Sequence, residues 1–206
     1  LVTNGTYSIT NEISITNAIT VRSLNGAPVT TVQRTGASEI LIFQVTHAGA
    51  VLDGFTIRNG YGVDGAGVYM TAGTVVNCDI RDNLVKDWAA MNGVGIYMAG
   101  GTITNCTIHN NTGPTPTTFF NGYGGGVYMT GGLLVKSSVI SNEFFTNTRG
   151  MGIYASGSGV VISHCNISYN KDTRDANAAG VCLEGGAKLR NSLVRGNTLA
   201  CSSATE

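Results

Sequence analysis

Charged residues are scarce in this chain of 206 residues. Lys, Arg, Asp and Glu make up 12% of the sequence, about half of the usual share of about 25%, and 12 basic residues balance 12 acidic ones. A neutral chain without a basic run argues against nucleic acid or an anionic membrane surface as the main partner. No apolar run approaches the length of about 18 residues that a transmembrane helix needs, and no signal peptide is recognisable.

Metal-binding and helical patterns are missing as well. The three histidines, His47, His109 and His164, are dispersed, and no pair of cysteines has C-x-x-C spacing. The spacing of zinc motifs is therefore absent, and we predict neither a metal nor a cofactor. Apolar residues at i, i+3 and i+4 are also absent, while the 29 glycines recur every few residues. A fold that alternates strands with long helices is thereby excluded.

The chain contains a repeat instead. One copy, GIYMAGGTITNCTIHNN, covers Gly95–Asn111, and related segments cover Gly67–Asn83, Gly126–Asn142, Gly152–Asn170 and Gly180–Asn197. Each copy reads glycine, apolar, tyrosine (cysteine in the last copy), apolar, then a glycine turn, then an alternating run that closes on asparagine. Five copies in one chain indicate a repeat architecture.

Within a copy the apolar residues alternate with polar ones, which is the period of a β-strand. In the copy at Gly95–Asn111, Ile96, Met98 and Ile108 would point inward, and Tyr97 would point outward. No single copy can bury its apolar face alone, but parallel stacking of the copies can. We predict an all-β parallel β-helix, a solenoid of about seven coils.

The copies also suggest how the domain is divided. Residues 1–60 read as irregular first coils, and residues 61–206 hold the five regular repeats, so 1–206 forms a single domain. The segment Val51–Gly60, VLDGFTIRNG, resembles the second half of the repeat with one residue inserted. A solenoid normally has a cap at each end. Neither end of the sequence resembles one, so we expect a fragment of a longer protein.

An asparagine closes every copy, and stacking would place these residues in one row. Asparagine tolerates left-handed turn geometry, and its side chain can bond to the backbone and to a neighbouring asparagine. We predict a structural ladder at a turn, formed by Asn83, Asn111, Asn142, Asn170 and Asn197.

Four irregular connections follow the ladder position: Leu84–Val94, Thr112–Gly125, Glu143–Met151 and Lys171–Ala179. Because they share one place in the repeat, they should project from one edge of the solenoid. Their aromatic residues either fold back over that edge or form a binding surface. These residues are Trp88, Phe119, Phe120, Tyr123, Phe144 and Phe145.

The outward tyrosines should form a second row beside these connections. Its members are Tyr69, Tyr97, Tyr128 and Tyr154. An aromatic strip can stack on sugars, and aromatic ladders also stabilise solenoids. Both interpretations remain open at this point.

Cysteines and glycosylation motifs leave alternatives too. Cys78 and Cys106 share one position in adjacent copies, and stacked neighbours have a separation that a disulfide can span; a Cys182–Cys201 bond is the other candidate. We favour free buried thiols, since inward cysteine behaves as a small apolar residue.

Sequons for N-glycosylation occur at four positions. They are Asn4, Asn105, Asn110 and Asn166.

The opening NGTYSITNEISITNAITVRSLNGAPVTTV, the VLDGFTIRNG segment and the five repeats together resemble a known family. They are similar to the right-handed parallel β-helix repeats of large bacterial secreted and surface proteins in the pectate-lyase-like superfamily. The residue pattern of the repeats is most similar to that of polymorphic outer-membrane and anchor-domain surface proteins. This resemblance covers essentially the whole chain and implies a three-sheet cross-section and an extracellular or cell-surface location. It implies no single activity, because the fold hosts lyases, hydrolases, epimerases, adhesins and spacers.

Enzymes of that superfamily use calcium-binding acids, GHG and RIK motifs or a DPH motif, and none of those three strings occurs in this chain. The best constellation is Asp79, Arg81 and His109 on adjacent coils, which a surface ion pair explains as well. We therefore lean toward a protein without catalytic activity, and no catalytic residue is assigned.

Two functions remain as hypotheses. The first is a structural or adhesive module, such as a filament subunit that stacks head to tail through open strand edges, with lateral contacts from the connections. The alternative is a polysaccharide-binding or lyase-like protein that uses the tyrosine row and the adjacent connections. Ice binding is disfavoured because Leu133 interrupts the row that begins with Thr74 and Thr102.

Overall fold

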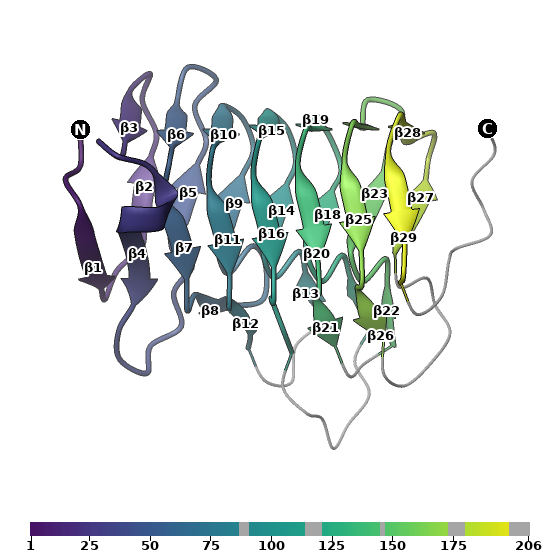
Figure 1. The fold of residues 1–206 in the computed structure, drawn as a ribbon, viewed down its shortest axis with the longest axis horizontal. Coiled ribbons are helices and arrows are strands. Elements are labelled where there is room, and N and C mark those ends of the chain that lie inside the picture. The colour runs from purple at the N-terminus through teal and green to yellow at the C-terminus, as the bar shows by residue number, and fades with distance from the viewer. Residues whose placement is uncertain (87–90, 114–120, 145–146, 173–179, 198–206) are drawn as a thin grey trace.

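The fold is a solenoid of parallel strands (Figure 1). The computed structural model describes residues 1–86, 91–113, 121–144, 147–172 and 180–197. Three long parallel sheets run the length of the solenoid, one with eight strands and two with seven. Each coil contributes one strand to each sheet, so the prediction of about seven coils is confirmed.

The eight-stranded sheet carries the strand that leads into each ladder asparagine. Its strands are β1 (Gly5–Ile9), β4 (Thr30–Arg34), β7 (Thr56–Arg58), β11 (Asp79–Arg81), β16 (Thr107–His109), β20 (Ser138–Ile140), β25 (Asn166–Ser168) and β29 (Leu193–Arg195).

The tyrosine sheet carries the Gly–apolar–Tyr strand of each repeat. It consists of β2 (Ile13–Ile15), β5 (Phe43–Val45), β9 (Val68–Met70), β14 (Ile96–Met98), β18 (Val127–Met129), β23 (Ile153–Ser156) and β27 (Val181–Glu184).

The third sheet follows the glycine turn, and a short 3-10 helix, η1 (Ala27–Val29), links its first strand to β4. The third sheet consists of β3 (Thr20–Arg22), β6 (Val51–Asp53), β10 (Thr74–Val76), β15 (Thr102–Thr104), β19 (Leu133–Val135), β24 (Val161–Ser163) and β28 (Lys188–Arg190).

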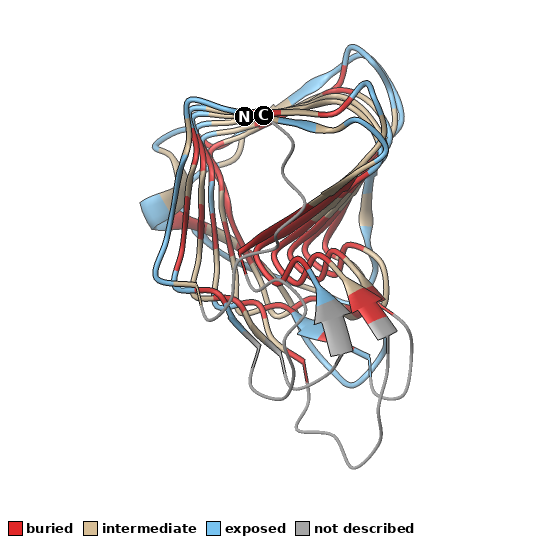
Figure 2. Cartoon of the chain, turned by 90° about the vertical axis from the view of Figure 1, so that its right-hand side faces the viewer, coloured by how far each residue is buried: buried red, intermediate tan, exposed pale blue. Residues whose placement is uncertain are grey.

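The core is built from columns of residues in exact vertical register along the solenoid. In the eight-stranded sheet, Ile80 lies opposite Ile57 on one side and Ile108 on the other, and all three are fully buried. Seen end-on, the coils overlay with their buried residues facing a common interior (Figure 2). Parallel neighbours lie about 4.8 Å apart, so an apolar residue that recurs once per coil always packs on its equivalent.

Left-handed backbone turns the chain at the corners. Asparagine was expected to supply this geometry at the ladder position itself, but the left-handed residue is the one before each ladder asparagine. It has φ 54° at Asp82, 53° at Asn110, 54° at Ser141 and 58° at Tyr169. The ladder residue is thereby free to direct its side chain inward.

The segment Val51–Gly60 follows the repeat without an inserted residue, which corrects the prediction. Leu52 pairs with Val75, and Ile57 pairs with Ile80, so the spacing between the two strands is unchanged. Phe55 takes the place that Cys78 has in the next coil. Because phenylalanine replaces the cysteine of the repeat, the correspondence between the two segments was not recognised from the sequence.

The irregular connections stack on one another at one edge, below the main sheets in Figure 1. Their described parts pair in register and cover a second apolar cluster that includes Val85, Met91 and Met151. The short strands at this edge are β8 (Tyr61–Gly62), which precedes the first connection, and β12 (Leu84–Val85), β13 (Met91–Asn92), β17 (Asn121–Tyr123), β21 (Glu143–Phe144), β22 (Asn147–Arg149) and β26 (Lys171–Asp172) within the connections.

Candidate functional site

The asparagine row forms a continuous chain of hydrogen bonds inside the solenoid. Asn83 Nδ2 donates to Asn111 Oδ1 at 2.9 Å, Asn111 Nδ2 to Asn142 Oδ1 at 3.0 Å, and Asn142 Nδ2 to Asn170 Oδ1 at 2.9 Å. Asn170 Nδ2 continues the row to Asn197 Oδ1 at 3.0 Å. Because the asparagine side chains bond to one another from coil to coil, the row has a structural role in holding the coils together.

The tyrosine row is a stack of rings. The ring centroids of Tyr69 and Tyr97 are 4.8 Å apart with planes 6° from parallel. Those of Tyr97 and Tyr128 are 5.2 Å apart, and those of Tyr128 and Tyr154 are 5.4 Å apart. Such stacked pairs contribute about 0.5–1.5 kcal/mol each beyond the burial of their area.

Stacking determines which ring surfaces a ligand can reach. Both faces of Tyr97 and of Tyr128 are covered by neighbouring rings. Only the terminal ring, Tyr69, has a tyrosine on one side alone, and the residue opposite its other side is Gln44. The middle of the row therefore offers ring edges and hydroxyl groups, and a free aromatic face can exist only at the Tyr69 end.

The other end of the stack is closed by polar contacts. Tyr123 packs on Tyr154 at a centroid distance of 4.7 Å, and the Tyr154 hydroxyl donates to Glu184 Oε2 at 2.7 Å. Arg149 Nη1 is 2.9 Å from Glu184 Oε1. Burial, and then the bond to Glu184, raise the pKa of Tyr154, and burial also raises the pKa of Tyr97 and Tyr128. These hydroxyl groups remain protonated at neutral pH.

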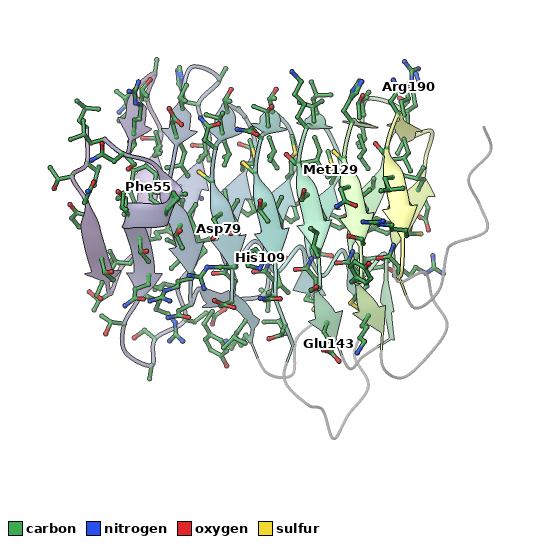
Figure 3. All side chains as sticks on the ribbon, viewed as in Figure 1. Phe55, Asp79, His109, Met129, Glu143 and Arg190 are labelled. Carbon is green, nitrogen blue, oxygen red and sulfur yellow. The ribbon has the colours of Figure 1, made fainter. Side chains whose placement is uncertain are left out.

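The acid–base constellation lies together, as Figure 3 shows for Asp79 and His109. Asp79 Oδ1 is 2.8 Å from His109 Nε2, and Asp79 Oδ2 is 3.2 Å from Arg81 Nε. Arg81 also pairs with Asp82. All of these side chains are only about a quarter to two-fifths exposed. Each carboxylate already has a cationic or hydrogen-bonding partner, which is the arrangement of a surface ion-pair network.

The cysteine row is internal. Cys78, Cys106 and Cys165 are buried free thiols, and Cys182 is buried as well. The backbone N–H of Cys78 donates to Cys106 Sγ at 3.4 Å, and that of Cys106 to Ser137 Oγ at 3.2 Å. The hydrogen bond with Cys78, and then burial, raise the pKa of Cys106, and burial raises that of Cys165. The raised pKa keeps Cys106 and Cys165 protonated, and protonated, buried thiols are poor nucleophiles.

A pocket of about 370 Å³ lies beside the Tyr69 end of the stack. It is formed by the first three coils, and its lining residues include Glu12, Glu39 and Asp64 together with Tyr69 and Gln44. The sequence did not predict this pocket. Its residues lie before or at the start of the regular repeats, where the sequence alone gives no register.

Comparison with known families identifies the chain. Residues 39–205 match the family model described as a right handed beta helix region. The chain belongs to the right-handed β-helix family. No curated protein matches this β-helix, and no solved structure does.

Several of the predicted site residues lie outside the described part of the β-helix. These are Trp88, Phe119, Phe120, Phe145 and Cys201. Phe144 belongs to β21, but its side chain is not described. Among the aromatic residues predicted for the connections, Tyr123 is the one whose side-chain contacts are known, and it is half-buried against the tyrosine stack.

The glycosylation motifs differ in their accessibility. Asn4, Asn105 and Asn110 are exposed, whereas Asn166 is half-buried and its Oδ1 is buried without a hydrogen bond.

Within the described ranges, no group of three or more His, Cys, Asp and Glu side chains could hold a metal ion. In the same ranges, no helix has the length and apolar character for crossing a membrane.

Proposed function

We propose that this β-helix is a structural module without catalytic activity that associates head to tail with a second copy of itself, at the cell surface or outside the cell. The observation that carries the proposal is the apolar character of the two end faces. The proposed location rests on the resemblance of the repeats to those of bacterial surface proteins.

The apolar column of the eight-stranded sheet ends on an accessible side chain at both ends of the described solenoid. Val194 continues the column of Ile167, yet Val194 is 37% exposed and Ile167 is 0% exposed. At the first coil, Tyr7 lies opposite the buried Val32 and is 37% exposed. The last described members of the four columns are Tyr7, Ile13, Ile15 and Val21 at one end and Val194, Val181, Leu183 and Leu189 at the other. Ile15 and Val181 are buried, and Ile13, Val21, Leu183 and Leu189 are half-buried.

A second copy could continue all three sheets. Its β1, β2 and β3 would lie beside β29, β27 and β28, in the same order and direction as neighbouring coils within one chain. The edges of sheets are templates for pairing. Because the two end faces differ, the contact is heterologous and produces a fibre unless it closes into a ring.

Rigidity along the axis supports the same role. The asparagine ladder and the tyrosine stack both tie consecutive coils together. The polysaccharide-binding alternative has less support, since the faces of Tyr97 and Tyr128 are covered by other rings. A glycan screen of the Tyr97→Ala, Tyr128→Ala double variant tests it, and loss of a wild-type signal would restore it.

Negative-stain electron microscopy and sedimentation velocity over a rising concentration series test the proposal. We expect fibres or elongated oligomers that lengthen with concentration. Val194→Lys should keep the protein monomeric, because it places a charge on the contact. Val29→Lys is the matched control, since Val29 is 43% exposed on η1 at the side of the solenoid and should leave assembly unchanged.

A wild-type chain that stays monomeric at every concentration would contradict the proposal. Assembly that Val194→Lys leaves intact would contradict the head-to-tail geometry. Circular dichroism of each variant distinguishes loss of assembly from loss of fold.

A further inference from the structure

The pocket beside Tyr69 has unequal charge around its wall. Its three carboxyl groups come from three successive coils, Glu12 before β2, Glu39 before β5 and Asp64 before β9. Glu39 already binds an ammonium group, because Lys86 Nζ lies 2.6 Å from Glu39 Oε2. The chain's own lysine thus shows how a carboxylate at this rim receives a primary amine.

The other two carboxylates have neutral partners. Ser14 Oγ donates to Glu12 Oε1 at 3.2 Å, and Asn92 Nδ2 donates to Asp64 Oδ1 at 2.9 Å. Within the described ranges, no Lys, Arg or His nitrogen lies within 4.0 Å of either carboxylate. Among the described residues, these two negative charges therefore have no paired cation.

Apart from Gln44 and Gly62, the rest of the wall is apolar or aromatic. Ile40, Leu41 and Val63 line it, and Tyr69 contributes the one ring of the stack that has a tyrosine on a single side. A tyrosine ring attracts an organic cation through its negative face. Apolar side chains favour methylene groups that leave water. Carboxylates, a ring and an aliphatic wall in one cavity match a ligand with positive ends and an apolar middle.

We propose that this pocket binds an aliphatic diamine, with its ammonium groups at Glu12 and Asp64 and its methylene chain against Ile40, Leu41 and the Tyr69 ring. The volume of about 370 Å³ lies within the range of about 300–1,000 Å³ of small-molecule sites. This binding function does not rest on the proposed assembly, because the pocket is lined by residues of three successive coils and not by those of an end coil alone.

Isothermal titration calorimetry with 1,5-diaminopentane at low ionic strength tests the proposal, with pentylamine and 1-pentanol as probes of equal chain length. We expect affinity to fall from the diamine to the monoamine and to vanish for the alcohol. Glu12→Gln and Asp64→Asn should each weaken diamine binding about twofold to fivefold, the range of a partly exposed ion pair. Glu143→Gln, which removes the same charge from β21, is the matched control and should change nothing.

Two further variants test separately the contribution of the Tyr69 ring and that of the Lys86 charge to diamine binding. Tyr69→Leu keeps an apolar side chain and removes the ring, so affinity should fall about threefold through the lost cation–π contact. Lys86→Gln leaves the Glu39 carboxylate without its cation, which adds a third unpaired negative charge to the wall, and should strengthen diamine binding about twofold to fivefold. If Lys86 had only a structural role, its replacement would not increase the affinity for the diamine.

Absence of binding by the wild-type chain at saturating diamine would overturn the proposal. Equal affinity for 1-pentanol and the diamine would do so as well. So would diamine binding that Glu12→Gln, Asp64→Asn and Lys86→Gln all leave unchanged, since the ligand would then sit elsewhere.

Discussion

Replacement of Asn111 by alanine tests how the asparagine ladder holds the coils together. The residue is 0% exposed, and its Oδ1 accepts from Asn83 through the backbone N–H at 3.2 Å and through Nδ2 at 2.9 Å. Its Nδ2 donates to the carbonyl oxygen of Ile80 at 3.2 Å and to Asn142 Oδ1 at 3.0 Å. No other described residue of this coil supplies these four bonds.

The cost follows from what alanine leaves behind. The buried N–H of Asn83 loses its acceptor, at about 1–3 kcal/mol, and three further hydrogen bonds contribute about 0.5–1.5 kcal/mol each. Partial relaxation recovers some of this sum. We expect Asn111→Ala to lower the free energy of unfolding by about 3–6 kcal/mol.

Urea denaturation followed by circular dichroism measures the change, with the m-value as a check on the denatured state. The matched control is Asn11→Ala, because Asn11 is exposed and should stay within about 0.5 kcal/mol of the wild type. If Asn111→Ala also stays within about 1 kcal/mol of the wild type at an unchanged m-value, the ladder does not stabilise the fold as argued.

Three other perturbations test the core, the tyrosine stack and its ionisation. Ile108→Asp places an unpaired charge at a fully buried position and should abolish soluble folded protein; a near-normal melting temperature would contradict the inward assignment. Tyr97→Ala should cost about 1–3 kcal/mol through two lost stacking contacts, whereas Tyr97→Phe should cost less than about 0.5 kcal/mol; denaturation curves that are equal for both would refute the stacking role. Because the folded-state pKa of Tyr154 is raised, its contribution to stability is present below the unfolded pKa of about 10 and is lost as the pH rises above it. Tyr154→Phe should therefore show a smaller loss of stability between neutral and alkaline pH than the wild type does, and an equal loss would count against the assignment.

The repeat made most of the fold predictable from sequence. Strand identity, inward residues and the number of coils follow from a period of two within a copy and from recurrence between copies, as Ile80 and Ile108 illustrate. The first coils were harder, because Phe55 replaces a cysteine and Gly60 replaces a ladder asparagine. The connections were harder still, since their pairing depends on neighbouring coils and has no pattern of its own.

The pocket could not be derived in the same way. Glu12, Glu39 and Asp64 belong to the irregular first coils and to the connection that follows them, so nothing in their spacing assigns them to one wall. Their proximity depends on the register of β2, β5 and β9, which places Gln44 beside Tyr69. Only the coordinates supply that register.

The tyrosine row, in contrast, could have been interpreted more sharply from the repeat alone. Coils lie about 4.8 Å apart, which is also close to the distance at which aromatic rings stack. An aromatic residue that recurs once per coil therefore uses both ring faces on its neighbours, as Tyr97 does. A longer row adds stability but no further binding faces, since only the terminal rings remain open. For this β-helix, Tyr69 is the terminal ring with Gln44 opposite its outer side, and the pocket beside it is the place where we propose that a ligand binds.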